Sequence, residues 1–183
     1  PRNAFYHARE LTFYYRWQEA ITYLKKYLDM PEATWQNERA YAMRLLGKSY
    51  AELNNHWEAI KWFRLAVAEA PNTREPWVEL SMICYRHGMW AECYSSALSA
   101  LNIKDKQLVY TMDPEVWGDR PHDLASIGAW HLGLSQEAIK HCRNALELAP
   151  ENARLLANLQ NMTDHPNLVQ FDTVTPNGIS ESD

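Results

Sequence analysis

The sequence predicts an all-α fold: a right-handed superhelix of about four helical-hairpin repeats, closed by one more helix at the C-terminal end. Two observations predict it. Three stretches, which begin at Ala40, Arg74 and Asp119, follow a single template of 34 residues. The chain also combines an apolar fraction of 46% with only 6 glycines and 9 prolines, as expected of a mostly helical protein. Helical repeats of this length stack so that each repeat contacts only its neighbours.

The stretch from Ala40 to Thr73 shows the template most clearly. Its apolar and small residues recur at intervals of three and four, which predicts two amphipathic helices. Seven residues fall on the template positions that serve helix packing and the closing turn: Leu46, Gly47, Tyr50, Ala59, Phe63, Ala66 and Pro71. Residues 74–107 follow without a gap and place Gly88 in the turn between the helices, where a residue without Cβ is favoured.

The first and last repeats match the template less closely. Residues 1–34 keep the helical period and contain two predicted helices that meet near Tyr15–Trp17. Pro31 ends the second of these helices. The last repeat has Gly133 in its turn and ends at Pro150. The predicted repeats therefore lie near residues 1–34, 40–73, 74–107 and 119–152.

A capping helix is predicted over residues 151–162, with Leu155, Leu156 and Leu159 facing inward. A solenoid needs such a cap because its last repeat would otherwise present an apolar face to water. The solenoid is thus assigned to residues 1–162. Residues 163–183 lack a helical period, and an irregular or disordered tail is predicted there.

An insertion, residues 104–118, interrupts the spacing between the third and fourth repeats. It can be a long loop whose Tyr110, Met112 and Trp117 pack on the flank of the solenoid. It can also be a functional loop, since long loops between repeats often carry contacts to partners. The sequence leaves both interpretations open.

Charge and cysteine content limit the partners and the compartment. The 23 acidic and 18 basic residues give a net charge of −5, too small to predict binding to nucleic acid or membranes. The three cysteines are an odd number at helical positions, which favours reduced thiols and a cytoplasmic location. No secretory leader or membrane-spanning run is visible. The chain opens at Pro1 within a helical pattern, so we expect a piece of a longer protein.

No catalytic constellation is recognisable, and the chain is predicted not to be an enzyme and to need no cofactor. The sequence contains no glycine-rich phosphate loop, nucleophile elbow or paired-cysteine metal motif. Three histidines, His122, His131 and His141, fall in the fourth repeat near Asp123 and Cys142. Their spacing does not put two ligands on one helix face, so they are interpreted as packing or surface histidines and not as metal ligands.

The concave surface is the predicted binding site. The first helix of each pair lines it, and the partner-binding residues predicted there are Arg2, Phe5, Arg9, Phe13, Tyr41, Arg44, Lys48, Tyr85, Arg86, Arg120, Trp130 and His131. Over all inward template positions, six fixed cations face three anions. Such a groove suits an extended, acidic protein or peptide, because arginine forks to carboxylates and aromatic rings supply contact area. The alternative is that these charges only keep an open groove soluble.

The 34-residue pattern is identified as that of the tetratricopeptide repeat family. The resemblance implies two antiparallel helices per repeat and a scaffold that binds proteins or peptides. Family members that clamp an acidic C-terminus use lysine and asparagine at groove positions 5 and 9. This chain has Phe5, Arg9, Arg44 and Lys48 at those positions, so that particular partner is not implied.

Three phrases, FYHAREL, TREPWVEL and PHDLASIGAWHLG, resemble the helical region that follows the catalytic domain in some bacterial and phage glycosyltransferases. This resemblance implies an alternative function. The chain would be the acceptor-positioning C-terminal region of a nucleotide-sugar-dependent glycosyltransferase, with the catalytic domain in cis before Pro1. The sequence has no Asp-x-Asp motif, so no catalytic residue is carried over.

Overall fold

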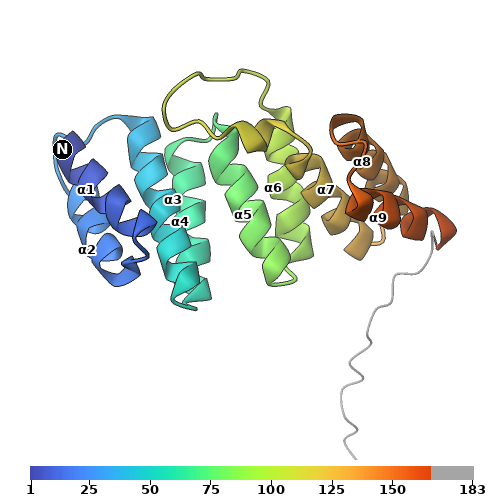
Figure 1. The fold of residues 1–183 in the computed structure, drawn as a ribbon, viewed down its shortest axis with the longest axis horizontal. Coiled ribbons are helices and arrows are strands. Elements are labelled where there is room, and N and C mark those ends of the chain that lie inside the picture. The colour runs from blue at the N-terminus through green and yellow to red at the C-terminus, as the bar shows by residue number, and fades with distance from the viewer. Residues whose placement is uncertain (166–183) are drawn as a thin grey trace, which may run out of the picture.

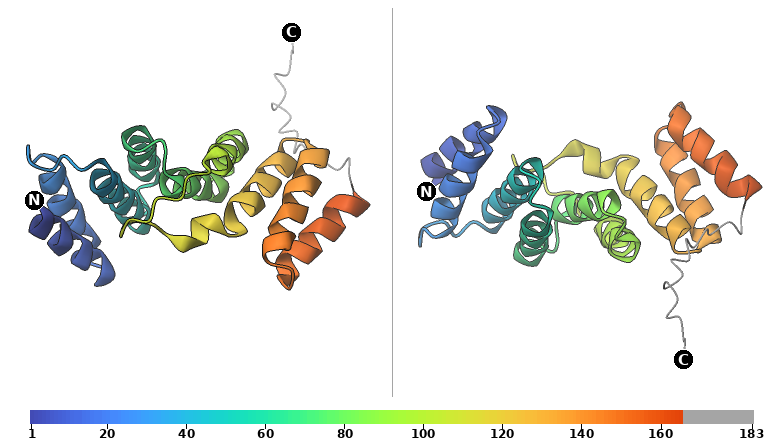
Figure 2. Two further views of the ribbon diagram at one scale, coloured as in Figure 1. Left: turned by 90° about the horizontal axis from the view of Figure 1, so that it is seen from above. Right: turned by 90° about the horizontal axis from the view of Figure 1, so that it is seen from below.

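The computed structural model describes residues 1–165, which fold into nine α-helices and one short 3-10 helix, with no β-strand in that range. Four antiparallel helix pairs stack side by side into an elongated array (Figure 1). The pairs are α1 (Arg2–Phe13) with α2 (Trp17–Leu28), α3 (Gln36–Glu52) with α4 (His56–Glu69), α5 (Arg74–Arg86) with α6 (Trp90–Asn102), and α7 (Arg120–His131) with α8 (Ser135–Leu148). Successive pairs change direction along the array (Figure 2). The predicted all-α superhelix is confirmed.

The turn inside each pair has the same geometry in all four pairs. One residue of each turn has a positive φ, and these residues, Tyr15, Asn54, Gly88 and Gly133, all fall on template position 15. The amide of the following residue donates to the carbonyl four residues before the positive-φ residue, at 2.9 Å in every pair. This is the hydrogen bond with which a left-handed residue ends a helix. Gly88 and Gly133 thus lie in the turns predicted for them.

The core runs along the array between the paired helices. Phe5, Leu24, Tyr27 and Leu46 are fully buried between the first two pairs, and Ile60, Val78 and Cys84 between the next two. Gly47 of α3 lies where α3 and α4 approach most closely. A Cβ built at Gly47 would be 2.9 Å from three ring atoms of Phe63, so a larger residue cannot fit without movement.

Helix α9 (Ala153–Asp164) packs on α8 and closes the array. It begins and ends two residues later than the predicted 151–162, so Thr163 and Asp164 are helical and do not belong to a tail. Leu155 is buried as predicted, but Leu156 is 49% exposed and Met162 takes the second inward position. The reason is that residues seven apart share a helix face, whereas adjacent residues do not. Residues 166–183 of the predicted tail lie outside the described residues.

The insertion leaves α6 at Asn102, runs over the ends of α5 and α3, and returns as the 3-10 helix η1 (Pro114–Trp117) (Figure 1). Val116 of η1 is buried in the core beside α5 and α7. The first part of the insertion therefore spans back toward the N-terminal repeats, while η1 is fixed in the core. No helix within residues 1–165 is both long and apolar enough to cross a bilayer.

Candidate functional site

The first helices α3, α5 and α7 line the hollows of the structure, and the insertion separates two parts of the surface that these helices form. We call the region under the insertion the covered part; it includes Glu38, Tyr41, Arg44 and Glu75. We call the remainder the open part; it consists of two adjoining hollows between the C-terminal ends of α3 and α5, η1, α7 and α9.

Tyr110 attaches the insertion to the first two repeats. Its hydroxyl donates to Glu38, a buried carboxylate that also accepts from the Tyr27 hydroxyl at 2.7 Å. The Tyr110 ring lies beside the rings of Tyr6 and Trp35, with centroids 6.2 and 5.3 Å away. Burial and the Glu38 carboxylate raise the pKa of both tyrosines, so both phenols stay protonated as donors.

Arg44 forms the second attachment, below Tyr110. Its guanidinium is bidentate to Glu79 of α5, with N–O distances of 2.7 and 2.8 Å, and it donates to the Thr111 backbone oxygen at 3.3 Å. The guanidinium carbon also lies 5.0 Å from the centre of the Tyr41 ring. The side chain is 8% exposed. Arg44 therefore joins α3, α5 and the insertion and is not available to a partner.

The third attachment involves Arg74 and Glu75 at the start of α5. Arg74 donates to the backbone oxygens of Ile103 and Val116, and its guanidinium carbon lies 3.8 Å from the centre of the Trp117 ring. Glu75 accepts from the backbone amide of Asp113 at 3.1 Å. Both ends of the insertion are thus held by buried side chains of one helix turn.

The open part has an apolar floor and a charged rim. Its hollows have volumes of about 250 and 280 Å³, and they share Met82, Arg86 and Arg120. The apolar lining comes from Ala51, Phe63, Val78, Met82, Ile83, Tyr85, Val116, Leu124 and Ile127. Hollows of this shape accept single apolar side chains with polar contacts at the edge.

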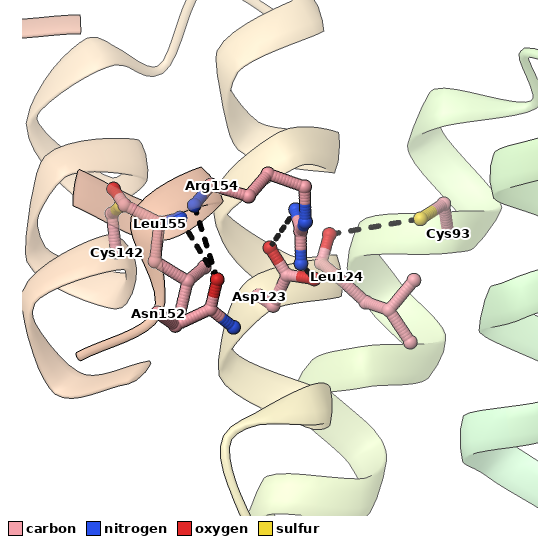
Figure 3. Close-up of polar contacts among 7 residues, drawn as sticks. All are labelled: Cys93, Asp123, Leu124, Cys142, Asn152, Arg154 and Leu155. Carbon is pink, nitrogen blue, oxygen red and sulfur yellow. Dashed lines mark hydrogen bonds and ion pairs between the residues drawn. The ribbon is translucent and has the colours of Figure 1, made fainter. Parts of the chain in front are cut away.

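The charges of the open part are balanced. Four cations and four carboxylates line it: Lys48, Arg86, Arg120 and Arg154 against Glu52, Glu79, Asp113 and Asp123. Arg154 of α9 reaches across to Asp123 of α7 with two hydrogen bonds of 3.0 and 2.7 Å (Figure 3), and Arg120 pairs with Glu115. Lys48 and Arg86 are exposed and form no ion pair within residues 1–165. Among the four lining cations, these two have no carboxylate partner in the described residues and can pair with a partner's acidic group.

The structure corrects two of the predicted binding residues. Phe5 is fully buried among the rings of Tyr6, Tyr27 and Tyr41, because three helices enclose its position in the first repeat. Arg44 is buried under the insertion. Trp130 packs on the cluster around Cys142 and Met162, and the exposed His131 stacks on Trp90 at 3.7 Å; neither lines the two hollows of the open part.

Five of the other predicted residues lie in the two parts, and three lie on α1. Lys48, Tyr85, Arg86 and Arg120 line the open part. Tyr41 lies in the covered part, half-buried. Arg2, Arg9 and Phe13 lie on α1: Arg2 is 3.8 Å from Glu38, and Arg9 lies over the rings of Tyr6 and Phe13. The twelve residues thus do not form one continuous surface.

The template places Met82 at an inward position, but the predicted binding residues do not include it. Sequence reasoning missed Glu79, Asp113 and Arg154 as charges of the groove. Glu79 is one residue away from an inward template position. Asp113 and Arg154 lie outside the repeats that the template describes. No signal in the repeat pattern marks these three.

The histidines of the fourth repeat behave differently from one another. His122 of α7 and His141 of α8 face each other, with their Nδ1 atoms 3.0 Å apart, whereas His131 at the end of α7 stacks on Trp90 of α6. Burial lowers the pKa of His122 to about 4, and the positive charge of His141 adds to the shift. No group of three or more His, Cys, Asp or Glu side chains in residues 1–165 is arranged to hold a metal ion.

Comparisons with known proteins agree with this architecture. The sequence model of the tetratricopeptide repeat family matches residues 40–73. Among solved structures, a MamA variant (the RS-1 ArsTM double mutant) has a TM-score of 0.72 at 12% identity, covering 92% of this chain and 85% of that one. YrrB, described as a tetratricopeptide repeat protein with an unusual peptide-binding site, has a TM-score of 0.62 at 17% identity, covering 84% and 71%.

The tetratricopeptide repeat domain of OM64 from Arabidopsis has a TM-score of 0.60 at 14% identity, covering 72% of this chain and 99% of the domain. No curated protein sequence matches the chain. At these identities the structural likeness shows the fold, which is typical of non-catalytic scaffolds that bind proteins. Residues 40–73 thus match the tetratricopeptide repeat model, and the described residues have the fold of tetratricopeptide repeat solenoids, with the same turn geometry in all four helix pairs.

Proposed function

We propose that the chain is a non-catalytic scaffold that binds a segment of a partner protein in the open part of its groove. The segment places an apolar side chain in the hollow over Met82 and an acidic side chain near Lys48 and Arg86. The observation that supports this is the apolar floor beside two exposed cations without ion partners. The three buried, unpaired thiols favour a reducing compartment, and we place the chain in the cytoplasm.

The balanced lining limits what charge can contribute. Because four carboxylates also line the open part, bulk attraction does not select an acidic partner. The selection rests on the two side chains Lys48 and Arg86, and on the apolar contact next to them. An acidic group within reach of either cation forms charge-assisted hydrogen bonds, which are stronger than neutral ones.

Selection of binders from a random peptide display library tests this proposal. We expect enriched peptides to combine a large apolar residue with Asp or Glu a few positions away. The double variant Lys48→Glu/Arg86→Glu should bind the best peptide more than about tenfold more weakly, which corresponds to about 1.4 kcal/mol. Its melting temperature should stay near that of the unchanged chain, since both side chains are exposed.

Arg143→Glu is the matched control. Arg143 is an exposed cation on α8 that lines neither hollow, so its reversal changes the net charge without touching the open part. Equal binding by the double variant and the control would contradict the proposal, as would enriched peptides without acidic residues. The acceptor-positioning alternative rests on the sequence resemblance alone and stays a prediction.

A further inference from the structure

The covered part holds a segment of its own chain in the way that a receptor holds a ligand. Residues 107–113 form neither a helix nor a strand, yet they contact residues far away in the sequence. Tyr110 bonds to Glu38, Thr111 to Arg44 and Asp113 to Glu75, across separations of 72, 67 and 38 residues. These contacts join the segment to two different repeats.

The side chains that hold the segment, Glu38 and Arg44, also have hydrogen-bond partners outside it. Glu38 also accepts a hydrogen bond from Tyr27, and Arg44 also forms a bidentate pair with Glu79, so each has a partner outside the segment. A buried polar group becomes costly when it loses its last partner. Because both floor residues have partners within the solenoid, removal of the segment leaves the floor in place.

The first residues of the segment are exposed, although Thr111 is buried. Gln107 is exposed and Leu108 is 82% exposed, whereas the neighbouring η1 is fixed by the buried Val116. Two of the four long-range hydrogen bonds use backbone atoms of the segment, the Thr111 oxygen and the Asp113 amide, and the other two use the side chains of Gln107 and Tyr110. Another chain with a tyrosine at the matching place can therefore make the same contacts.

We propose that the covered part is a second peptide-binding site, which residues 107–113 occupy in cis. The partner is a protein segment that contains a tyrosine, inserts its hydroxyl against Glu38 and presents a backbone carbonyl to Arg44. It displaces residues 107–113 and leaves η1 in the core. This inference goes beyond the proposed function, because it concerns a different part of the groove and does not depend on what the open part binds.

Binding of the segment in trans tests the inference. Residues 105–112 are replaced by a glycine–serine linker of equal length, and a fluorescein-labelled peptide with the sequence of residues 104–114 is the probe. The segment in cis competes at an effective concentration near the millimolar range, so the unchanged chain should bind the probe at least about tenfold more weakly than the linker variant. A probe with phenylalanine in place of tyrosine should bind the variant more weakly, and a scrambled probe should not bind.

The inference is overturned if the folded linker variant binds the probe no better than the scrambled peptide, or no better than the unchanged chain does. Adding Lys48→Glu/Arg86→Glu to the linker variant should leave probe binding unchanged, which separates this site from the open part. Circular dichroism of the linker variant checks that it is folded.

Hydrogen exchange of the unchanged chain decides the question if the linker variant does not fold. The amides of Met112 and Asp113 should exchange at least about a hundredfold faster than those of α3 and α5, through opening of the segment alone. Equal protection of the segment and these helices would mean that the segment leaves only when the solenoid unfolds, and displacement by a partner would be excluded.

Discussion

Arg44 and Lys48 lie one turn apart on α3, and both occupy inward positions of the same repeat template. Arg44, in the covered part, is buried, paired with Glu79 and bonded to the insertion. Lys48, in the open part, is exposed and has no ion partner within residues 1–165. The difference teaches that a template position fixes the direction of a side chain and not its role. What covers the position decides whether a charge stabilises the fold or stays available for binding.

Removal of the Arg44 partner should show the largest difference between the two parts. Glu79→Ala leaves a buried guanidinium without its carboxylate, and we expect the free energy of unfolding to fall by about 3 kcal/mol. Lys48→Ala should change it by no more than about 0.5 kcal/mol, as is usual for exposed positions. Urea unfolding followed by circular dichroism measures both. Similar losses for the two variants would show that the parts do not differ as described.

Gly47 lies between these two residues along α3 and faces α4 instead of the groove. Gly47→Leu pushes a side chain into the Phe63 ring, which a Cβ alone would already approach to 2.9 Å. We expect a loss of about 1–3 kcal/mol from overpacking. Thermal unfolding measures it, and the open part should still bind its peptide in the fraction that stays folded. A variant as stable as the unchanged chain would argue against this close approach of α3 and α4.

The fold could be predicted from the sequence because the repeat template specifies local geometry. Position 15 needs a left-handed residue wherever two paired helices meet, and Asn54, Gly88 and Gly133 supply residues that adopt this conformation readily. Tyr15 shows that the tertiary structure can impose the same turn on a bulky residue. Helix pairs, turns and the order of repeats follow from such short-range rules.

The groove could be predicted only in part, because its state depends on long-range contacts. The template describes first helices that no other segment covers. The aromatic residues of 104–118 suggest packing on the flank of the solenoid, but the sequence does not indicate that this packing covers α3 and α5. The partners of Arg44, Glu79 and Thr111, are 35 and 67 residues away in the sequence. The excess of cations predicted for the groove therefore disappears when Arg44 is buried and Asp113 and Glu79 join the lining.

Removal of one tyrosine hydroxyl from each part, at Tyr110 and at Tyr85, compares how much each hydroxyl contributes to stability. Tyr110→Phe removes a donor to the buried Glu38, and we expect a loss of about 1–2 kcal/mol. Tyr85→Phe removes an exposed hydroxyl in the open part and should leave stability unchanged within about 0.5 kcal/mol. Chemical unfolding measures both losses. If the two variants lose equal stability, Tyr110 does not hold the insertion in solution.

The smallest expected effect is a dependence on pH in the fourth repeat, next to the open part. The Nδ1 atoms of His122 and His141 share one hydrogen bond, which requires that at least one ring is neutral. Burial lowers the pKa of His122 to about 4, and His141, Arg74 and Lys104 add to this shift. Burial and then Lys140 lower the pKa of His141, while Glu137 opposes them.

Both pKa values therefore lie below the ordinary value of about 6.5 for an unfolded chain. Between the folded and unfolded values the unfolded chain binds more protons, so the stability is complete above about pH 6.5 and falls as the pH drops toward about 4. Since the His122 ring is only half-buried, we expect a loss of about 1 kcal/mol. His122→Gln should flatten this part of the profile of unfolding free energy against pH. Hydrogen exchange should show α7 and α8 opening before α3, because the covered part contains no histidine pair. Parallel profiles for the variant and the unchanged chain would show that the histidine pair does not cause the acid sensitivity.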